Sequence, residues 1–247
     1  MRYLIPFITF ITISIETNAQ LKLSIESGYV TTQYNDVQVP NSDQASGTLF
    51  SLSDDFADEG SGVFIRAELA YLIGGRHTVE LTAAPLTLGY ESSTLSEINF
   101  AGTTFLGNNI SGQYQFNTYR ASYRYRLVDR SKFTFDIGAS LLVRDARIVL
   151  SEGFMEADDT DLGYVPLVSF QLDYLPSDQL TIMLKGDALV GPVGRAEDVF
   201  AGILFEIIDN RLDLKAGYRV IEGGADVDQV YNFAFFHFAD FGIVIKI

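Results

Sequence analysis

The 247-residue sequence contains no cysteine, no tryptophan and only two histidines. The absence of cysteine excludes a disulfide framework, a thiolate metal centre and a cysteine nucleophile. Basic residues are also scarce, because 17 lysines and arginines oppose 32 aspartates and glutamates, for a formal net charge of −15. Affinity for nucleic acids comes largely from cations that neutralise phosphates. We therefore expect no nucleic-acid partner.

Long apolar runs are missing as well. The apolar stretch over residues 4–15 is followed by the small residues Thr17 and Ala19. A membrane-spanning helix needs about 20 apolar residues, so this stretch is too short for an anchor and instead fits a secretory signal. We predict a signal peptide over residues 1–19, cleaved after Ala19, and a single domain over residues 20–247.

The rest of the chain shows a period of two. In residues 62–73, Val63, Ile65 and Leu69 occupy alternate positions. Arg66 and Glu68 lie between them, which is the pattern of a strand with one apolar and one charged face. The same alternation recurs to the C-terminus and predicts ten strands.

The predicted links between these strands alternate between short and long. The short links are residues 74–76, 129–131, 176–178 and 209–210. The longer links are residues 35–61, 91–112, 151–160, 191–197 and 224–229. An even number of antiparallel strands, with tight turns at one end and longer loops at the other, is typical of an outer-membrane β-barrel. Eight or twelve strands stay open, because residues 47–53 could pair as an extra strand with part of 91–112.

Strand parity alone does not distinguish a water-soluble barrel from one embedded in lipid, since the apolar face points inward in the first and outward in the second. The predicted signal, the long strands and aromatic residues near strand ends, such as Tyr71, Tyr125 and Tyr174, favour lipid. We therefore predict an all-β fold, an antiparallel transmembrane β-barrel of about ten strands. It would lie in the bacterial outer membrane with both termini on the periplasmic side.

In such a barrel the charged face lines the interior. The interior of a barrel of about ten strands is only modestly wider than side chains can fill, and an unpaired buried charge is costly. We therefore expect a paired charge network that plugs the lumen, with a narrow path gated by residues 35–61 as the alternative. The predicted lumen network comprises Arg66, Glu68, Glu80, Arg120, Arg124, Arg126, Asp136, Arg144, Asp173, Lys185, Asp187, Glu206, Asp213, Lys215, Arg219 and Asp240.

Acidic residues concentrate in the longer links. Hard divalent cations prefer carboxylate oxygens, so Asp54, Asp55, Asp158 and Asp159 are weak candidates for cation contacts. No spacing matches a calcium-binding loop, and we assign no metal site. The expected partners are outer-membrane lipid and lipopolysaccharide, with divalent cations possible at the acidic loops.

Several short motifs resemble those of an uncharacterised group of small outer-membrane β-barrel proteins from Gram-negative bacteria. They are Arg76-His77, the run Ala84-Pro85-Leu86, residues 123–130, and residues 222–228 followed by 231–233. The resemblance covers the whole predicted mature chain and implies the fold, but it carries no activity. The terminal Ile247 departs from the phenylalanine or tryptophan with which such barrels usually end.

The two histidines decide the enzyme hypotheses. Omptin proteases also have ten strands and use carboxylates and a histidine at the outer rim, whereas His77 opens a strand at the opposite end. His237 faces lipid by parity, but Phe235 and Ala239 stand where a lipid hydrolase would place its serine. Ser27 could approach His237 only if the first and last strands brought them together.

We assign no catalytic residue and expect no cofactor, since no nucleotide-binding or zinc motif is present. The sequence favours a structural or interaction role with a charge-filled lumen. A small porin-like channel is the alternative, and a lipid-modifying enzyme is a third hypothesis.

Overall fold

The computed structural model describes residues 20–56, 60–92, 96–107, 109–192 and 194–247. The predicted signal peptide, residues 1–19, lies outside these described residues, so its cleavage stays a prediction. All regular elements in the described part of the chain are β-strands. No described helix has the length and apolar character needed to cross a membrane.

Ten strand paths form the wall of the molecule, and two short hairpins and one short strand lie at its wider end. The wall strands are β1 (Gln20–Gln38), β5 (Ser61–Ile73), β6 (His77–Ala84) with β7 (Thr87–Glu91), β10 (Ser111–Arg130), β11 (Phe133–Glu152), β12 (Met155–Ser177), β13 (Leu180–Gly191), β14 (Gly194–Ile208), β15 (Leu212–Val227) and β16 (Val230–Lys246). The remaining strands are β2 (Asn41–Ser42), β3 (Ala45–Ser46), β4 (Phe50–Ser51), β8 (Ile98–Phe100) and β9 (Thr103–Phe105).

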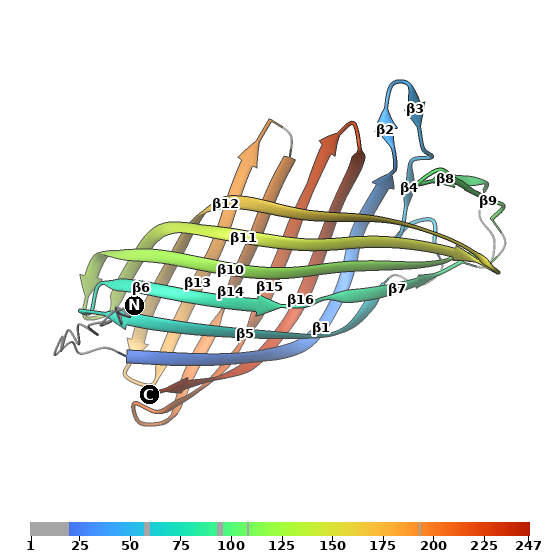
Figure 1. Cartoon of the computed structure of the whole chain (residues 1–247). Helices are drawn as coiled ribbons and strands as arrows, with labels where there is room; N and C mark the ends of the chain where they lie inside the picture. The colour runs from blue at the N-terminus through green and yellow to red at the C-terminus, as the bar shows by residue number, and fades with distance from the viewer. Residues whose placement is uncertain (1–19, 57–59, 93–95, 108, 193) are drawn as a thin grey trace, which may run out of the picture.

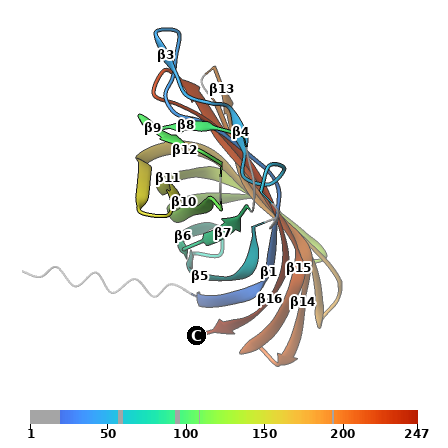
Figure 2. The ribbon, with the colours of Figure 1, turned by 90° about the vertical axis from the view of Figure 1, so that its right-hand side faces the viewer.

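Every pair of neighbouring wall strands is antiparallel, and the wall closes on itself (Figures 1 and 2). β6 and β7 are two parts of one path, because both pair with β10 and only Pro85 and Leu86 separate them. Proline cannot donate a ladder hydrogen bond, which explains the interruption. The result is a closed ten-strand barrel, and the predicted fold class is confirmed.

The barrel closes between β1 and β16. The backbone amides and carbonyls of Leu21 and Ile247 bond to each other at one end of this seam. Farther along, Gly28 pairs with Asp240, and a Cβ atom on Gly28 would lie only 1.9 Å from the carbonyl oxygen of Ala239. Glycine is required at this position because the two backbones approach too closely for a side chain.

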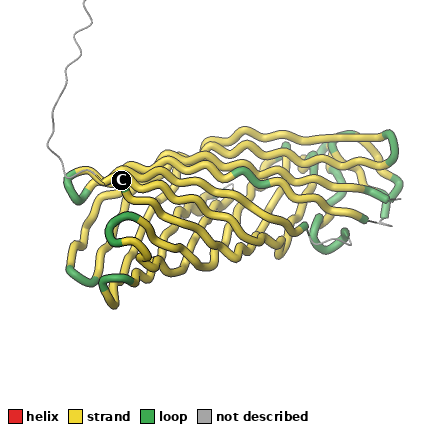
Figure 3. Tube along the Cα trace, turned by 90° about the horizontal axis from the view of Figure 1, so that it is seen from below, coloured by secondary structure: helices red, strands yellow, loops and turns green. Residues whose placement is uncertain are grey.

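The connections gather at two ends of the barrel (Figure 3). We call the end with the tight turns around residues 75, 131, 178 and 210 the turn end, and the opposite end the loop end. The start of β1 and the C-terminus both lie at the turn end (Figure 1).

Three of the longer links were predicted wrongly. β11 ends at Glu152 and β12 begins at Met155, so residues 151–160 form a tight hairpin. The links 191–197 and 224–229 are likewise short, because backbone pairing continues through the polar residues. An antiparallel ladder needs no apolar side chains once it extends beyond the buried or lipid-facing part of the wall.

The possible extra strand over residues 47–53 does not pair with 91–112 as a strand in the described residues. Phe50 and Ser51 form β4, which pairs with β1, while β8 and β9 pair with each other. The β2–β3 hairpin projects beyond the loop end (Figure 1). Apolar side chains from the rest of the two long links pack inside the barrel mouth, and neither link adds a wall strand.

Candidate functional site

The alternation of burial along each wall strand places every residue of the predicted lumen network on the inward face. The structure divides these residues into three groups along the barrel axis. Most of them meet in a central layer, several line a cavity at the turn end, and Arg144 lies apart, paired with Asp161 nearer the loop end.

Asp198 is the main carboxylate of the central layer. Its oxygens lie 2.5 Å from the Arg120 guanidinium, 2.9 Å from that of Arg219 and 3.1 Å from that of Arg66. Arg219 also reaches Glu26, at 2.7 Å, and all these side chains are almost fully buried. One carboxylate therefore holds together arginines from three strands, β5, β10 and β15.

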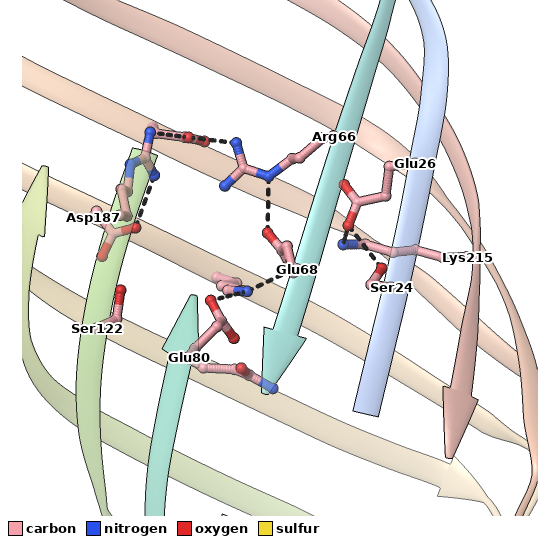
Figure 4. A network of polar contacts seen from close by, with 12 residues as sticks. Ser24, Glu26, Arg66, Glu68, Glu80, Ser122, Asp187 and Lys215 are labelled. Carbon is pink, nitrogen blue, oxygen red and sulfur yellow. Dashed lines mark hydrogen bonds and ion pairs between the residues drawn. The ribbon is translucent and has the colours of Figure 1, made fainter. Parts of the chain in front are cut away.

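A second cluster lies beside the first. The Lys185 ammonium bridges Glu68, at 2.8 Å, and Glu80, at 2.7 Å. Arg124 donates to Glu80 at 2.7 Å, and Lys215 contacts Glu26 at 2.5 Å. Figure 4 shows side chains of both clusters pointing toward one another from different strands across the interior.

We call these residues together the central charged layer. Its cations and anions are equal in number, and each side chain has at least one partner of opposite charge within 4 Å. A buried ion whose partner is lost is strongly destabilising, so the pairing holds the layer together. The layer consists of Arg66, Arg120, Arg124, Lys185, Lys215 and Arg219 with Glu26, Glu68, Glu80, Asp187, Asp198 and Asp240.

Two members of this layer are absent from the sequence prediction. Glu26 is fully buried, and the alternation of Ser24, Glu26 and Val30 with outward residues of β1 is the signal that could have found it. Asp198 directly follows the predicted link 191–197 and was left out of the predicted lumen network. It lies inside the barrel because β14 begins earlier than the apolar pattern indicates.

A polar cavity of about 390 Å³ occupies the turn end of the lumen. Its walls include Arg126, which pairs with Asp136 at 2.8 Å, and the ion pair Lys246–Asp213, at 2.7 Å. The predicted residues Asp173 and Glu206 also line it; Asp173 accepts a hydrogen bond from Gln171, and Glu206 contacts Lys246. The cavity ends at Glu68, Glu80, Lys185 and Lys215 of the central charged layer.

On the loop side of the central charged layer, the inward residues become apolar. Along β5 the inward positions change from Glu68 and Arg66 to Phe64, and along β16 they change from Asp240 to Phe238. Side chains from the two long links pack on them. We call the resulting cluster the apolar plug; its members include Phe50, Leu52, Phe56, Phe64, Leu88, Tyr90, Phe100, Phe105, Ile110, Tyr114, Leu150, Phe236 and Phe238.

Aromatic contacts hold the apolar plug together. The rings of Phe64 and Phe238 meet edge to face at 5.1 Å between centroids, and those of Phe50 and Phe100 do so at 6.0 Å. The Tyr90 hydroxyl bonds to Thr32 at 2.8 Å, so its polar end is satisfied although the ring is buried. A charged layer and an apolar layer of the described side chains thus occupy the lumen in succession.

The four acidic cation candidates do not converge. Asp55 accepts a hydrogen bond from the Ser51 amide at 2.7 Å, and Asp54 accepts one from Ser53. Asp158 faces outward and pairs with Arg147 at 3.0 Å, whereas Asp159 faces inward. Within the described residues, no group of three or more histidines and carboxylates is arranged to hold a metal ion.

In the described part of the chain, no serine hydrogen-bonds to either histidine. His77 is at the turn end, where its Nδ1 lies 2.8 Å from the Tyr123 hydroxyl. His237 faces outward and bonds to the Tyr218 hydroxyl. The register pairs His237 with Thr31, and Ser27 lies four residues farther along β1, about 13 Å away at about 3.3 Å per residue.

The outer surface of the wall carries many exposed apolar side chains, which we call the apolar belt. A soluble monomer rarely exposes an apolar surface of this extent. The belt includes Ile25, Tyr29, Val63, Ile65, Leu69, Leu81, Tyr119, Tyr123, Ile137, Leu141, Val168, Ile182, Leu184, Ile203, Phe205, Leu214, Tyr218, Phe241 and Ile243.

No protein-family model and no curated protein matches the chain. Among solved structures, the chain is similar to the outer membrane protease OmpT from Escherichia coli, with a TM-score of 0.56, 7% identity, and 95% of this chain and 99% of that chain covered. Ail of Yersinia pestis gives a TM-score of 0.43 at 11% identity, covering 92% of this chain and 99% of Ail. A Pseudomonas aeruginosa FadL homologue gives 0.37 at 7% identity, covering 94% and 90%. At such low identity, the likeness to the protease is one of fold, the closed antiparallel barrel of an outer-membrane protein.

Proposed function

We propose that this chain is an integral protein of the bacterial outer membrane with a closed lumen, and that its role is structural or one of surface interaction. Three features support the membrane location: the closed barrel, the apolar belt around it and the signal peptide predicted over residues 1–19. In a lipid-embedded barrel the outward face is apolar and the backbone pairs around a closed ring.

The filling of the lumen by two successive layers of side chains is the observation that supports the proposed role. The central charged layer fills the interior with paired ions, and the apolar plug covers it on the loop side. Passage of a solute would require both the separation of buried ion pairs and the displacement of the plug. A closed barrel of this kind is suited to presenting its loop end to other molecules rather than to transport.

Conductance of the purified protein in a planar bilayer tests this proposal, after a heat-dependent gel shift has shown that the barrel is folded. We expect no discrete current steps, with a general porin as the positive control in the same bilayer. Steps whose size or selectivity changes in an Arg124→Glu variant would contradict the closed lumen. Membrane fractionation, together with a mature N-terminus at Gln20, tests the location and the signal peptide separately.

A porin-like channel is the second candidate, and one observation favours it. The cavity of about 390 Å³ at the turn end is polar and wide enough for water and small ions. It ends at the central charged layer, so conduction would need that layer to open. The bilayer measurement distinguishes a blind cavity from one that opens under an applied potential.

The acidic loop end provides the proposed contacts with the cell surface. Asp54 and Asp55 are exposed there, and Asp158 is partly exposed on the β11–β12 hairpin. Carboxylates in these positions can share divalent cations with the phosphates of lipopolysaccharide. Calcium titration of the folded protein, compared with an Asp54→Asn, Asp55→Asn variant, measures the contribution of that pair.

A further inference from the structure

The wall of the barrel is incomplete at one place near the loop end. β12 and β13 pair from Ser177–Leu180 up to Val168–Ala188, but β12 continues to Met155 and β13 only to Gly191. Above Val168, β12 runs on beside β11 while β13 and β14 take a different direction (Figure 1). In the described part of the chain, residues 158–166 of β12 pair with β11 alone.

Pro166 explains where the pairing stops. Leu141 and Pro166 are partners in an unbroken β11–β12 ladder, so the nitrogen of Pro166 points to the other side, toward β13. The Pro166 nitrogen carries no hydrogen, so it cannot donate a hydrogen bond to a β13 carbonyl oxygen. A proline on the β13 side therefore ends the β12–β13 ladder two residues above the Val168–Ala188 pair.

The same geometry shows which groups are left without a partner. Backbone polar groups alternate between the two edges of a strand, so Tyr164, Leu162 and Thr160 direct their N–H and C=O groups to the same side as Pro166. We call residues 158–166 of β12 the free edge. An exposed strand edge of this length is a ready template for a further strand.

A groove lies directly inside the free edge. We call it the side groove; it has a volume of about 50 Å³ and is open to solvent, so it admits only small side chains. Its apolar lining comes from strands on both sides of the gap, and β13 contributes none of it. The lining side chains include Phe116, Leu142, Val165, Leu167, Ala196 and Ile221.

Two carboxylates of the side groove are left without a cation. Arg144 pairs with Asp161, Arg195 with Glu222 and Arg147 with Asp158, and Arg120 belongs to the central charged layer. In the described chain no cation within 4 Å pairs with Asp159 or Glu197. A bound segment would thus meet backbone partners at its edge, an apolar surface on its inward side and carboxylates around it.

We propose that the free edge and the side groove together bind an extended polypeptide segment, as an added strand with small apolar residues at alternate positions and lysine or arginine between them. Main-chain hydrogen bonds to the edge would supply affinity, and the groove would select the inward side chains. This inference deepens the proposed function, because it names the class of partner and the surface that receives it. It does not depend on the lumen being closed.

A labelled nine-residue amide peptide that alternates lysine and valine tests the proposal, by fluorescence anisotropy with the folded full-length protein in detergent. We expect saturable binding and slower amide hydrogen exchange at Thr160, Leu162 and Tyr164. A peptide with N-methyl groups on its pairing edge keeps the charge and the side chains but cannot form the strand ladder. We expect it to bind at least tenfold more weakly.

Two further comparisons isolate the charge and the edge. A peptide with glutamate in place of lysine keeps the pairing but reverses the charge, and we expect at least a tenfold loss. In the protein, Thr160→Pro removes one edge N–H without touching the β11 ladder, and Thr160→Ala is its matched control. We expect the proline variant alone to weaken binding, by at least fivefold, with folding checked by gel shift.

Absence of binding at 1 mM peptide would overturn the proposal, as would equal binding of the N-methylated peptide. The second result would mean that the groove holds amphiphiles without strand pairing. Because both peptide comparisons use the unchanged protein, a misfolded Thr160→Pro variant does not decide the outcome. Current steps in a bilayer would contradict the closed lumen and leave the peptide result standing, so the two failures are distinguishable.

Discussion

Asp198→Asn is the substitution that tests the central charged layer most directly. Asp198 contacts Arg66, Arg120 and Arg219, whose side chains are each 3% exposed. Breaking a buried ion pair by removing one partner costs about 3–5 kcal/mol. The arginines keep their other carboxylate partners, so we expect the lower end of that range, about 3 kcal/mol of unfolding free energy.

The matched control is Asp158→Asn, the same chemical change on the β11–β12 hairpin. Asp158 has one cationic partner, Arg147, and both side chains are more than 40% exposed. Exposed pairs contribute about 0–1 kcal/mol. Since the chain contains no tryptophan, urea unfolding in detergent or vesicles is followed by circular dichroism and by the folded band on gels.

Equal destabilisation by Asp198→Asn and Asp158→Asn would refute the reasoning. It would mean that water solvates the lumen charges to the same extent as the surface charges. A second variant sharpens the test. Replacing Arg66 by methionine in the Asp198→Asn protein removes one of the cations left in excess. If buried net charge causes the loss of unfolding free energy, the double variant loses less of it than the sum of the losses in the two single variants.

Three other predictions follow from local geometry. Gly28→Ala places a Cβ atom 1.9 Å from the Ala239 carbonyl oxygen, so we expect it to prevent closure of the barrel and to abolish the heat-modifiable gel band. Gly89→Ala is the control, because a Cβ atom there meets open space and the band stays intact. Phe56→Ala opens a cavity in the apolar plug and costs about 3–5 kcal/mol locally, measured as faster proteolysis of the loop end in the folded protein. Asp159 lies beyond the apolar belt, and burial raises the pKa of its carboxyl group above the usual 3.8; the neighbouring Asp158 carboxylate raises this pKa further. The protonated carboxyl group therefore favours the folded state at pH values below 3.8. This stabilising contribution is lost as the pH rises through the folded-state pKa. Asp159→Asn therefore stabilises the protein at pH 7 and has no such effect at pH 3; a variant less stable than the parent at pH 7 would contradict this sign.

The barrel was predictable because its signal is local. Alternation in residues 62–73 identifies a strand and both of its faces, and the recurrence of that pattern identifies the antiparallel wall. The inward position of Arg66 or Lys185 follows from parity alone. Which carboxylate each would meet does not follow, because Lys185 and Glu68 come from strands far apart in the sequence and meet only after closure.

The link predictions failed for a different physical reason. Apolar periodicity reports which residues avoid water, and it fades where a strand continues past the apolar belt. Asp158 and Asp159 are therefore part of a regular ladder that looks like a loop in the sequence. The apolar plug was missed because Phe50 and Phe56 lie in a segment with no period, although several aromatic residues in one acidic link are a signal for a packed loop.

The pairing of Glu26 with Lys215 and Arg219 has a consequence for assembly in the cell. Glu26 lies on β1, and its partners Lys215 and Arg219 lie on β15, with β16 between the two strands. These ion pairs therefore form only after β1 and β16 have paired. A slip of one residue between β1 and β16 would turn Glu26 to the outer face and leave Lys215 inside the barrel without its carboxylate partner, whereas Arg219 would keep Asp198 and Asp240. A slip of two would keep the face but carry the carboxylate about 7 Å along the axis. The ion pairs thus favour one register of the closing strands, since a misregistered barrel would be less stable than the native one.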